Sequence, residues 1–104
     1  MATVVWSSEA LDDLESVRSY LATSSPSFAA IYVKRIVRAV DGLETVPGMG
    51  RKVVELDRDD VREVIFQNYR LPYRLQRDQV TILAVKKMPQ DLQLALEPRV
   101  WGVR

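Results

Sequence analysis

The sequence predicts an α+β fold in which an N-terminal strand and an αα-hairpin precede an antiparallel β-meander, with the helices packed on one face of the sheet. Three observations support this fold class. Apolar residues recur at helical spacing in the first half of the chain, the period becomes that of strands after residue 51, and a Pro/Gly-rich loop at residues 47–50 separates the two halves. Residues 1–104 are expected to form a single domain, with residues 89–104 as a tail.

Composition and charge exclude several kinds of site. The sequence contains no histidine and no cysteine, which excludes Ser-His-Asp triads, thiolate nucleophiles and zinc sites. The net charge is +1, with −2 over residues 1–50 and +3 over residues 51–104, so a dedicated DNA-binding protein is not expected. No apolar run approaches the ~20 residues that span a bilayer, and the start does not resemble a signal peptide. The expectation is a cytoplasmic protein without a membrane, metal or cofactor partner.

The first half is predicted to contain one strand and two helices. Thr3–Trp6 is a β-branched and aromatic run, and a serine at Ser7-Ser8 is placed to cap the helix that follows. Ser25 is placed to cap a second helix, with Pro26 at its first position, where a missing N–H costs no hydrogen bond. The apolar stripes of these helices are Ala10, Leu14, Val17 and Leu21, then Ala29, Val33, Ile36, Val40 and Leu43.

Four strands are predicted in the second half, at residues 52–56, 61–66, 69–76 and 79–86, with the first strand joining the edge of their sheet. Two-residue turns at Gln67-Asn68 and Arg77-Asp78 fix the register. The register pairs Phe66 with Tyr69, Val64 with Leu71, Arg62 with Tyr73, Leu75 with Val80, Tyr73 with Ile82, and Leu71 with Ala84.

This register divides the side chains between two faces. The face that carries the strand tyrosines is almost wholly apolar, so it is expected to lie under the helices, with Arg62 paired to a helix carboxylate. Pro72 lacks the N–H that an inner strand needs, which predicts a bulge or a one-residue shift. The opposite face has only the tail to cover it and collects Ile65, Arg70, Pro72, Arg74, Thr81, Leu83 and Val85.

Basic side chains are the chemically useful groups that remain. Asp57, Asp59 and Asp60 lack the glycine and glutamate of a calcium loop, so they are interpreted as a solvated turn. Arginine and lysine can hold phosphates or pair with the carboxylates of a protein partner, and the residues alone leave both uses open. The candidate set for phosphate chemistry is Lys52, Arg70 and Lys86.

The order of elements and several short motifs resemble the RelE/ParE toxin superfamily of bacterial type II toxin–antitoxin systems. The match runs from about Trp6 to Lys86 and depends on the order and spacing of its pieces, not on any single one. The pieces are Trp6-Ser7, Asp13-Leu14, Ser25-Pro26, Gly50-Arg51, Val61-Arg62-Glu63, Tyr69-Arg70-Leu71, Tyr73-Arg74 and Ile82-Leu83-Ala84-Val85. The sequence is most similar to ParE. That resemblance implies a toxin that inhibits DNA gyrase and is held inactive, in a hetero-oligomer, by a ParD-like antitoxin.

The alternative within the superfamily is a RelE-type ribosome-dependent mRNA endonuclease. Members often show a histidine just after the last strand, where this sequence reads Val85-Lys86-Lys87-Met88, so a non-enzymatic toxin is favoured. The residues expected to contact the antitoxin or the target are Arg51, Ile65, Arg70, Arg74, Leu83, Val85, Lys87 and Trp101.

Overall fold

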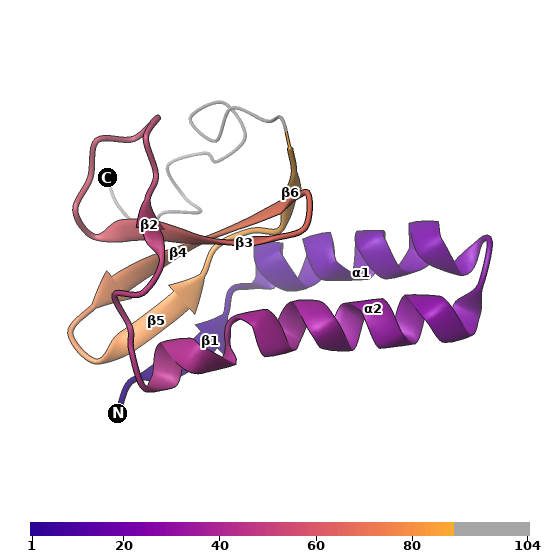
Figure 1. Ribbon diagram of the computed structural model, residues 1–104, viewed down its shortest axis with the longest axis horizontal. Helices are drawn as coiled ribbons and strands as arrows, with labels where there is room; N and C mark the ends of the chain where they lie inside the picture. The colour runs from indigo at the N-terminus through magenta and orange to yellow at the C-terminus, as the bar shows by residue number, and fades with distance from the viewer. Residues whose placement is uncertain (89–104) are drawn as a thin grey trace.

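The computed structural model describes residues 1–88, so Trp101 and the rest of the predicted tail lie outside the described part. The first half comprises β1 (Thr3–Trp6), α1 (Ser8–Ala22), α2 (Pro26–Ala39) and the 3-10 helix η1 (Asp41–Glu44). The second half comprises β2 (Arg51–Lys52), β3 (Val61–Phe66), β4 (Tyr69–Gln76), β5 (Gln79–Ile82) and β6 (Lys86–Lys87). The strand order is β1-β5-β4-β3-β2, with β6 paired to β4. Two helices against one sheet confirm the predicted α+β fold (Figure 1).

Both helices begin where the sequence predicts. The Ser7 hydroxyl oxygen accepts a hydrogen bond from the Ala10 N–H at 3.0 Å, and the Ser25 oxygen accepts one from the Phe28 N–H at 3.2 Å. α2 ends at Ala39, so Leu43 reaches the core from η1. The predicted stripes face the core, and Tyr32, which was not predicted, joins them. Within residues 1–88, neither helix is long and apolar enough to cross a membrane.

Ser7 connects α1 to the sheet as well as capping it. Its hydroxyl donates to the Leu83 carbonyl oxygen at 3.3 Å, and its N–H donates to the Ile82 carbonyl oxygen at 3.0 Å. We expect Ser7→Ala to lower the free energy of unfolding by about 1–2 kcal/mol, because it removes a cap and leaves the Leu83 carbonyl without the Ser7 hydroxyl. Ser25→Ala removes only a helix cap, so we expect it to lower the free energy of unfolding by about 1 kcal/mol. Urea denaturation of both variants checks whether Ser7→Ala lowers the free energy of unfolding more than Ser25→Ala does. An equal decrease would contradict a stabilising role for the hydrogen bond from Ser7 to Leu83.

The strand register follows the prediction over both hairpins. β3 and β4 pair Phe66 with Tyr69 and Arg62 with Tyr73, and β4 and β5 pair Leu75 with Val80 and Tyr73 with Ile82. Gln67 and Arg77 take φ values of 53° and 57°, which two-residue hairpin turns require at their first position. β1 pairs with β5 in parallel at the edge of the sheet, as expected.

The strand predicted at residues 79–86 is broken after Ile82, opposite Pro72. The Pro72 carbonyl oxygen accepts the Leu83 N–H at 2.9 Å, but Pro72 has no N–H to return, and the Leu83 carbonyl takes the Ser7 hydroxyl instead. Pairing with β4 resumes at Lys86, which lies opposite Arg70, so this side of the ladder contains one extra residue. Of the two predicted irregularities, the structure shows a bulge, but it lies in the strand opposite Pro72 and not at Pro72 itself, and the predicted Leu71–Ala84 pair is wrong. The extra residue also reverses the faces on which the next two side chains lie. Val85 therefore joins the core under the helices, and Ala84 packs on the opposite face of the sheet.

A second apolar cluster lies on the sheet face opposite the helices. Figure 1 shows the segment between β2 and β3 standing on that side of the sheet. The strand predicted at residues 52–56 is therefore wrong, because β2 ends at Lys52 and the chain turns at Val53, whose carbonyl accepts the Leu56 N–H at 3.2 Å. Packed in this cluster are Val53, Val61, Leu83 and Ala84, with Leu56 against them. We call residues 53–60 the covering segment.

Candidate functional site

The face predicted to be open for a partner is partly closed by the covering segment. Leu83 is 2% exposed and Arg70 is 8% exposed, so neither offers a surface for direct contact. Val85 is also buried, because the bulge turns it toward the helices. The expectation that Arg70, Leu83 and Val85 lie on one open face is therefore wrong. Its physical reason is that part of the chain, and not a partner, covers the apolar side chains there.

Arg70 is the centre of a buried ion network beneath the covering segment. Its Nε donates to Glu63 Oε1 at 2.6 Å, and its Nη2 donates to Glu55 Oε1 at 2.8 Å. Glu63, which is 1% exposed, also accepts from Arg51 Nε at 2.9 Å. The hydrogen bonds that Arg70 donates to Glu55 and, next in size, to Glu63 raise the pKa of its guanidinium above the usual value. Arg70 thus ties the covering segment to β3 and β4.

Arg62 does not pair with a helix carboxylate as predicted. Its Nη1 donates instead to the Gly50 carbonyl oxygen at 3.1 Å, where the chain enters β2. The same glycine donates its N–H to the Tyr73 hydroxyl at 3.0 Å, and that hydroxyl donates to the Pro47 carbonyl oxygen at 2.7 Å. Burial raises the pKa of the Tyr73 hydroxyl. These contacts confirm that Tyr73 belongs to the core, and they fix the loop before β2.

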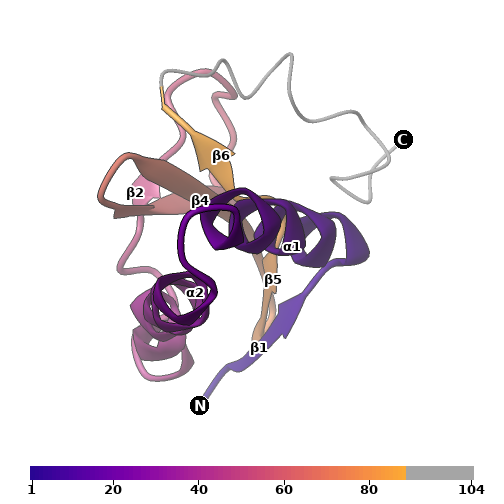
Figure 2. The same cartoon turned by 90° about the vertical axis from the view of Figure 1, so that its right-hand side faces the viewer.

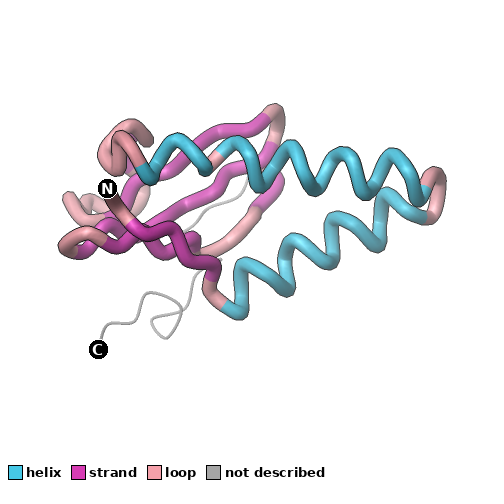
Figure 3. Tube along the Cα trace, turned by 90° about the horizontal axis from the view of Figure 1, so that it is seen from below, coloured by secondary structure: helices cyan, strands magenta, loops and turns pink. Residues whose placement is uncertain are grey.

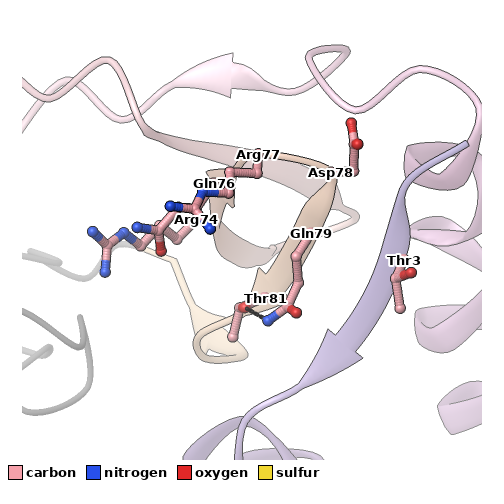
Figure 4. Close-up of a pocket in the computed structure, with 7 residues that line it drawn as sticks. All are labelled: Thr3, Arg74, Gln76, Arg77, Asp78, Gln79 and Thr81. Carbon is pink, nitrogen blue, oxygen red and sulfur yellow. Dashed lines mark hydrogen bonds between the residues drawn. The ribbon is translucent and has the colours of Figure 1, made fainter.

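Arg74 lies at the other end of the sheet face, beside a polar hollow. Its Nε donates to Asp60 Oδ2 at 3.0 Å, and Arg58 holds the same carboxylate with a 2.7 Å contact from Nη2. The hydrogen bond from Arg58 is the main cause that holds the Asp60 pKa below its usual value, and Arg74 adds to it. The hollow, shown in Figure 4, is lined by Thr3, Arg74, Gln76, Arg77, Asp78, Gln79 and Thr81.

The three residues proposed for phosphate chemistry each hold a carboxylate. Lys52 Nζ lies 3.1 Å from Asp59 Oδ1, Lys86 Nζ lies 3.2 Å from Asp13 Oδ1, and Arg70 binds Glu55 and Glu63. Arg70 and Lys86 are neighbours in the β4–β6 ladder, yet Lys86 reaches Asp13 on α1, whereas Arg70 reaches Glu63 on β3 and Glu55 in the covering segment. The structure therefore does not gather these three cations around one scissile group.

Two of the predicted contact residues line a groove between α1 and β6. The floor carries Val17, Tyr69 and Val85, the rim carries Lys87, and Tyr20 stands beside it with 72% of its surface exposed. Asp13 closes one end, where its Oδ2 accepts the Val85 N–H at 2.9 Å. The remaining lining residues are Ser16 and Lys86. We call this hollow the α1–β6 groove.

Sequence reasoning missed the α1–β6 groove for a specific reason. Tyr20 falls outside the apolar stripe of α1, and an exposed tyrosine on a helix gives no signal by itself. The groove forms because the bulge after Ile82 carries β6 back against α1. Arg51 and Ile65 lie elsewhere, in a shallow hollow beside β2 with Met49, Gly50, Glu63 and Val64. Among the described residues, the predicted contact set is thus spread over three separate surfaces.

Comparison with known proteins identifies the class. The helical hairpin on a mixed sheet is the fold of the RelE/ParE toxins, as the sequence predicts. A model of the family "ParE toxin of type II toxin-antitoxin system, parDE" matches residues 4–92. The chain therefore belongs to the ParE toxin family and is a ParE-like toxin of the type II class.

A solved structure supports the fold. A chain of the chromosomal ParDE TA system from P. aeruginosa is similar, with a TM-score of 0.71 and 24% sequence identity, over 84% of this chain and 96% of that chain. At this identity the likeness shows the fold alone. A search of curated proteins found no match.

Proposed function

We propose that this ParE-like toxin acts by binding proteins, inhibiting DNA gyrase and being neutralised in a hetero-oligomer by a ParD-like antitoxin. The family match supports a toxin, and the solved relative belongs to a ParDE system. Gyrase as target follows from the resemblance to ParE, and that target would place the toxin in the cytoplasm. The observation that carries a protein-binding function is the α1–β6 groove, because it combines an apolar floor with a lysine rim.

The groove fits an amphipathic segment of the antitoxin. Apolar side chains of such a segment would cover Tyr20 and Tyr69, above the buried Val85, while its carboxylates would pair with Lys87. Arg51, Ile65 and Arg74 are retained as proposed contacts on other surfaces, and Trp101 is retained as a contact outside the described residues. Arg70, Leu83 and Val85 are assigned a supporting role beneath the surface, since all three are buried.

The proposal predicts a loss of antitoxin affinity from groove substitutions. Tyr20→Ala combined with Lys87→Glu is expected to weaken the Kd for a co-encoded ParD-like antitoxin by about tenfold or more, because an aromatic anchor and a cation are lost together. Both side chains are exposed, so the fold should persist. The matched control is Arg77→Glu in the β4–β5 turn, which reverses a charge far from the groove. Calorimetry that finds equal affinities for the two proteins would reject the groove as the antitoxin site.

Gyrase inhibition is tested separately from antitoxin binding. Induction of the toxin alone should change plasmid supercoiling while transcripts stay intact, and purified toxin should inhibit gyrase supercoiling. Cuts placed by codon position in mRNA, with normal supercoiling, would instead favour the RelE-type endonuclease and overturn gyrase as the target.

A further inference from the structure

The solvent-facing side of α2 is a second surface with the character of a docking site. Ile31, Lys34, Arg35 and Arg38 follow the spacing i, i+3, i+4 and i+7, which places them on one face of the helix, and Phe28 lies one turn earlier. All five side chains are exposed, while Ala29 and Ile36 bury the opposite face. Seen from below the sheet, α2 lies beside α1 in front of the strands, and the hairpin extends past them (Figure 3). We call these five residues the basic α2 face.

No ion pair among residues 1–88 neutralises the charge of this face. α2 contains three cations and no carboxylate, whereas α1 carries four carboxylates. Among residues 1–88, the α1 carboxylates that form ion pairs hold Arg18 and Lys86, and none of the ion pairs involves Lys34, Arg35 or Arg38. Asp41 and Glu44 follow in η1 without pairing to these cations. The end-on view in Figure 2 shows α2 at the side of the molecule, away from β6 and hence from the α1–β6 groove.

The apolar members of the face decide what kind of partner fits. Ile31 is 51% exposed and Phe28 is 46% exposed. Ile31 lies one turn before Lys34 and Arg35, so a ligand that pairs with the cations must also cover an aliphatic side chain. Exposed apolar residues beside uncompensated charge are typical of protein interfaces.

We propose that the basic α2 face binds an acidic amphipathic helix of a partner protein, as a docking surface separate from the α1–β6 groove. Leucine-like side chains of the partner would cover Ile31 and Phe28, and its carboxylates would pair with Lys34, Arg35 and Arg38. The stripe runs over eleven residues of α2, from Phe28 to Arg38, and is about 15 Å long, which matches roughly three turns of a partner helix. The inference does not depend on gyrase being the target.

Two other partners fit the same face less well. Nucleic acid would satisfy the cations, but its phosphates would be placed against Ile31, and the net charge of +1 gives little general attraction to DNA. An anionic membrane would satisfy the cations too, but the remaining apolar stripe of α2 is buried in the core. Only Phe28 and Ile31 are left to insert, which is little apolar area for membrane binding.

The test uses a short synthetic helical peptide with leucine and glutamate at matching i, i+3, i+4 and i+7 positions, titrated into the full-length toxin. The expected result is saturable binding with amide shift changes centred on α2. Binding should weaken by about tenfold or more in Arg35→Glu/Arg38→Glu toxin, and also when glutamines replace the peptide's glutamates. The matched control is Arg18→Glu/Arg77→Glu, which makes the same change in net charge at exposed residues on other surfaces and should leave the Kd nearly unchanged.

Three outcomes would overturn the proposal. One is an affinity that falls equally in both charge-reversed toxins, since that reports net charge and not a site. Another is undiminished binding of the glutamine peptide. The third is failure of the acidic peptide to bind while a DNA duplex or phosphatidylserine vesicles bind in an Arg35- and Arg38-dependent way, which would assign the face to those ligands. Circular dichroism confirms that each variant is folded.

Discussion

Arg70→Met is expected to lower the free energy of unfolding by about 3–5 kcal/mol. The substitution removes the guanidinium that binds Glu63 at 2.6 Å, and Glu63 is 1% exposed, so a carboxylate is left buried with reduced compensation. It also releases Glu55 and with it the covering segment, which packs against Leu83 and Ala84. Urea denaturation gives the free energy, and limited proteolysis between residues 53 and 60 reports the release of the covering segment.

Arg51 supplies the matched control for this prediction. Arg51 donates to the same Glu63 carboxylate at 2.9 Å, but its side chain is 62% exposed, so Arg51→Met should cost less than about 1 kcal/mol. The double variant Arg70→Met/Glu63→Leu should recover much of the loss, because it removes the unpaired charge as well. If Arg70→Met were no more destabilising than Arg51→Met, the buried network would not be what holds the covering segment.

The register of the sheet was predictable because it depends on local features. Two-residue gaps between apolar runs set the β3–β4 and β4–β5 pairing, even though Gln67 and Arg77 are not the glycine or asparagine that favour positive φ. Both helix caps were also local, since Ser7 and Ser25 precede helical apolar stripes directly. The missing N–H of Pro72 also indicated where the strand pairing would be interrupted.

The environment of Arg70 was only partly predictable, because Glu63 lies across the predicted β3–β4 hairpin whereas Glu55 comes from the covering segment. Val53 to Leu56 reads as a short strand, but Val54 is 85% exposed while Val53 and Leu56 pack on the sheet, which is the spacing of a turn. The contact between Glu55 and Arg70 depends on that turn, so it cannot be predicted while residues 53–56 are assigned to a strand. The α1–β6 groove was missed for a similar reason, since the position of the bulge decides which face Val85 takes.

Gly50→Ala is the second substitution expected to have a large effect, about 3 kcal/mol or more. A Cβ atom at Gly50 would lie 2.6 Å from Tyr73 Cε1 and 2.7 Å from the Glu63 carbonyl oxygen. Neither neighbour can give way, because Tyr73 is fully buried and the carbonyl belongs to the β3 backbone. The added methyl group therefore forces the loop outward, which strains the packing and breaks the 3.0 Å hydrogen bond from the Gly50 N–H to the Tyr73 hydroxyl.

Gly48 allows the steric cause to be separated from a general glycine effect. A Cβ atom at Gly48 would meet nothing within 4 Å, so Gly48→Ala should be neutral or should stabilise slightly by restricting the unfolded chain. Urea denaturation of both variants compares their free energies of unfolding. Equal values would show that the loop before β2 accommodates a Cβ atom at Gly50 without strain. A large loss at Gly50 alone would mean that the loop, Tyr73 and the start of β2 form one rigid unit. In that case Arg51 and Ile65, the proposed contacts beside β2, are held in place by core packing and not by a partner.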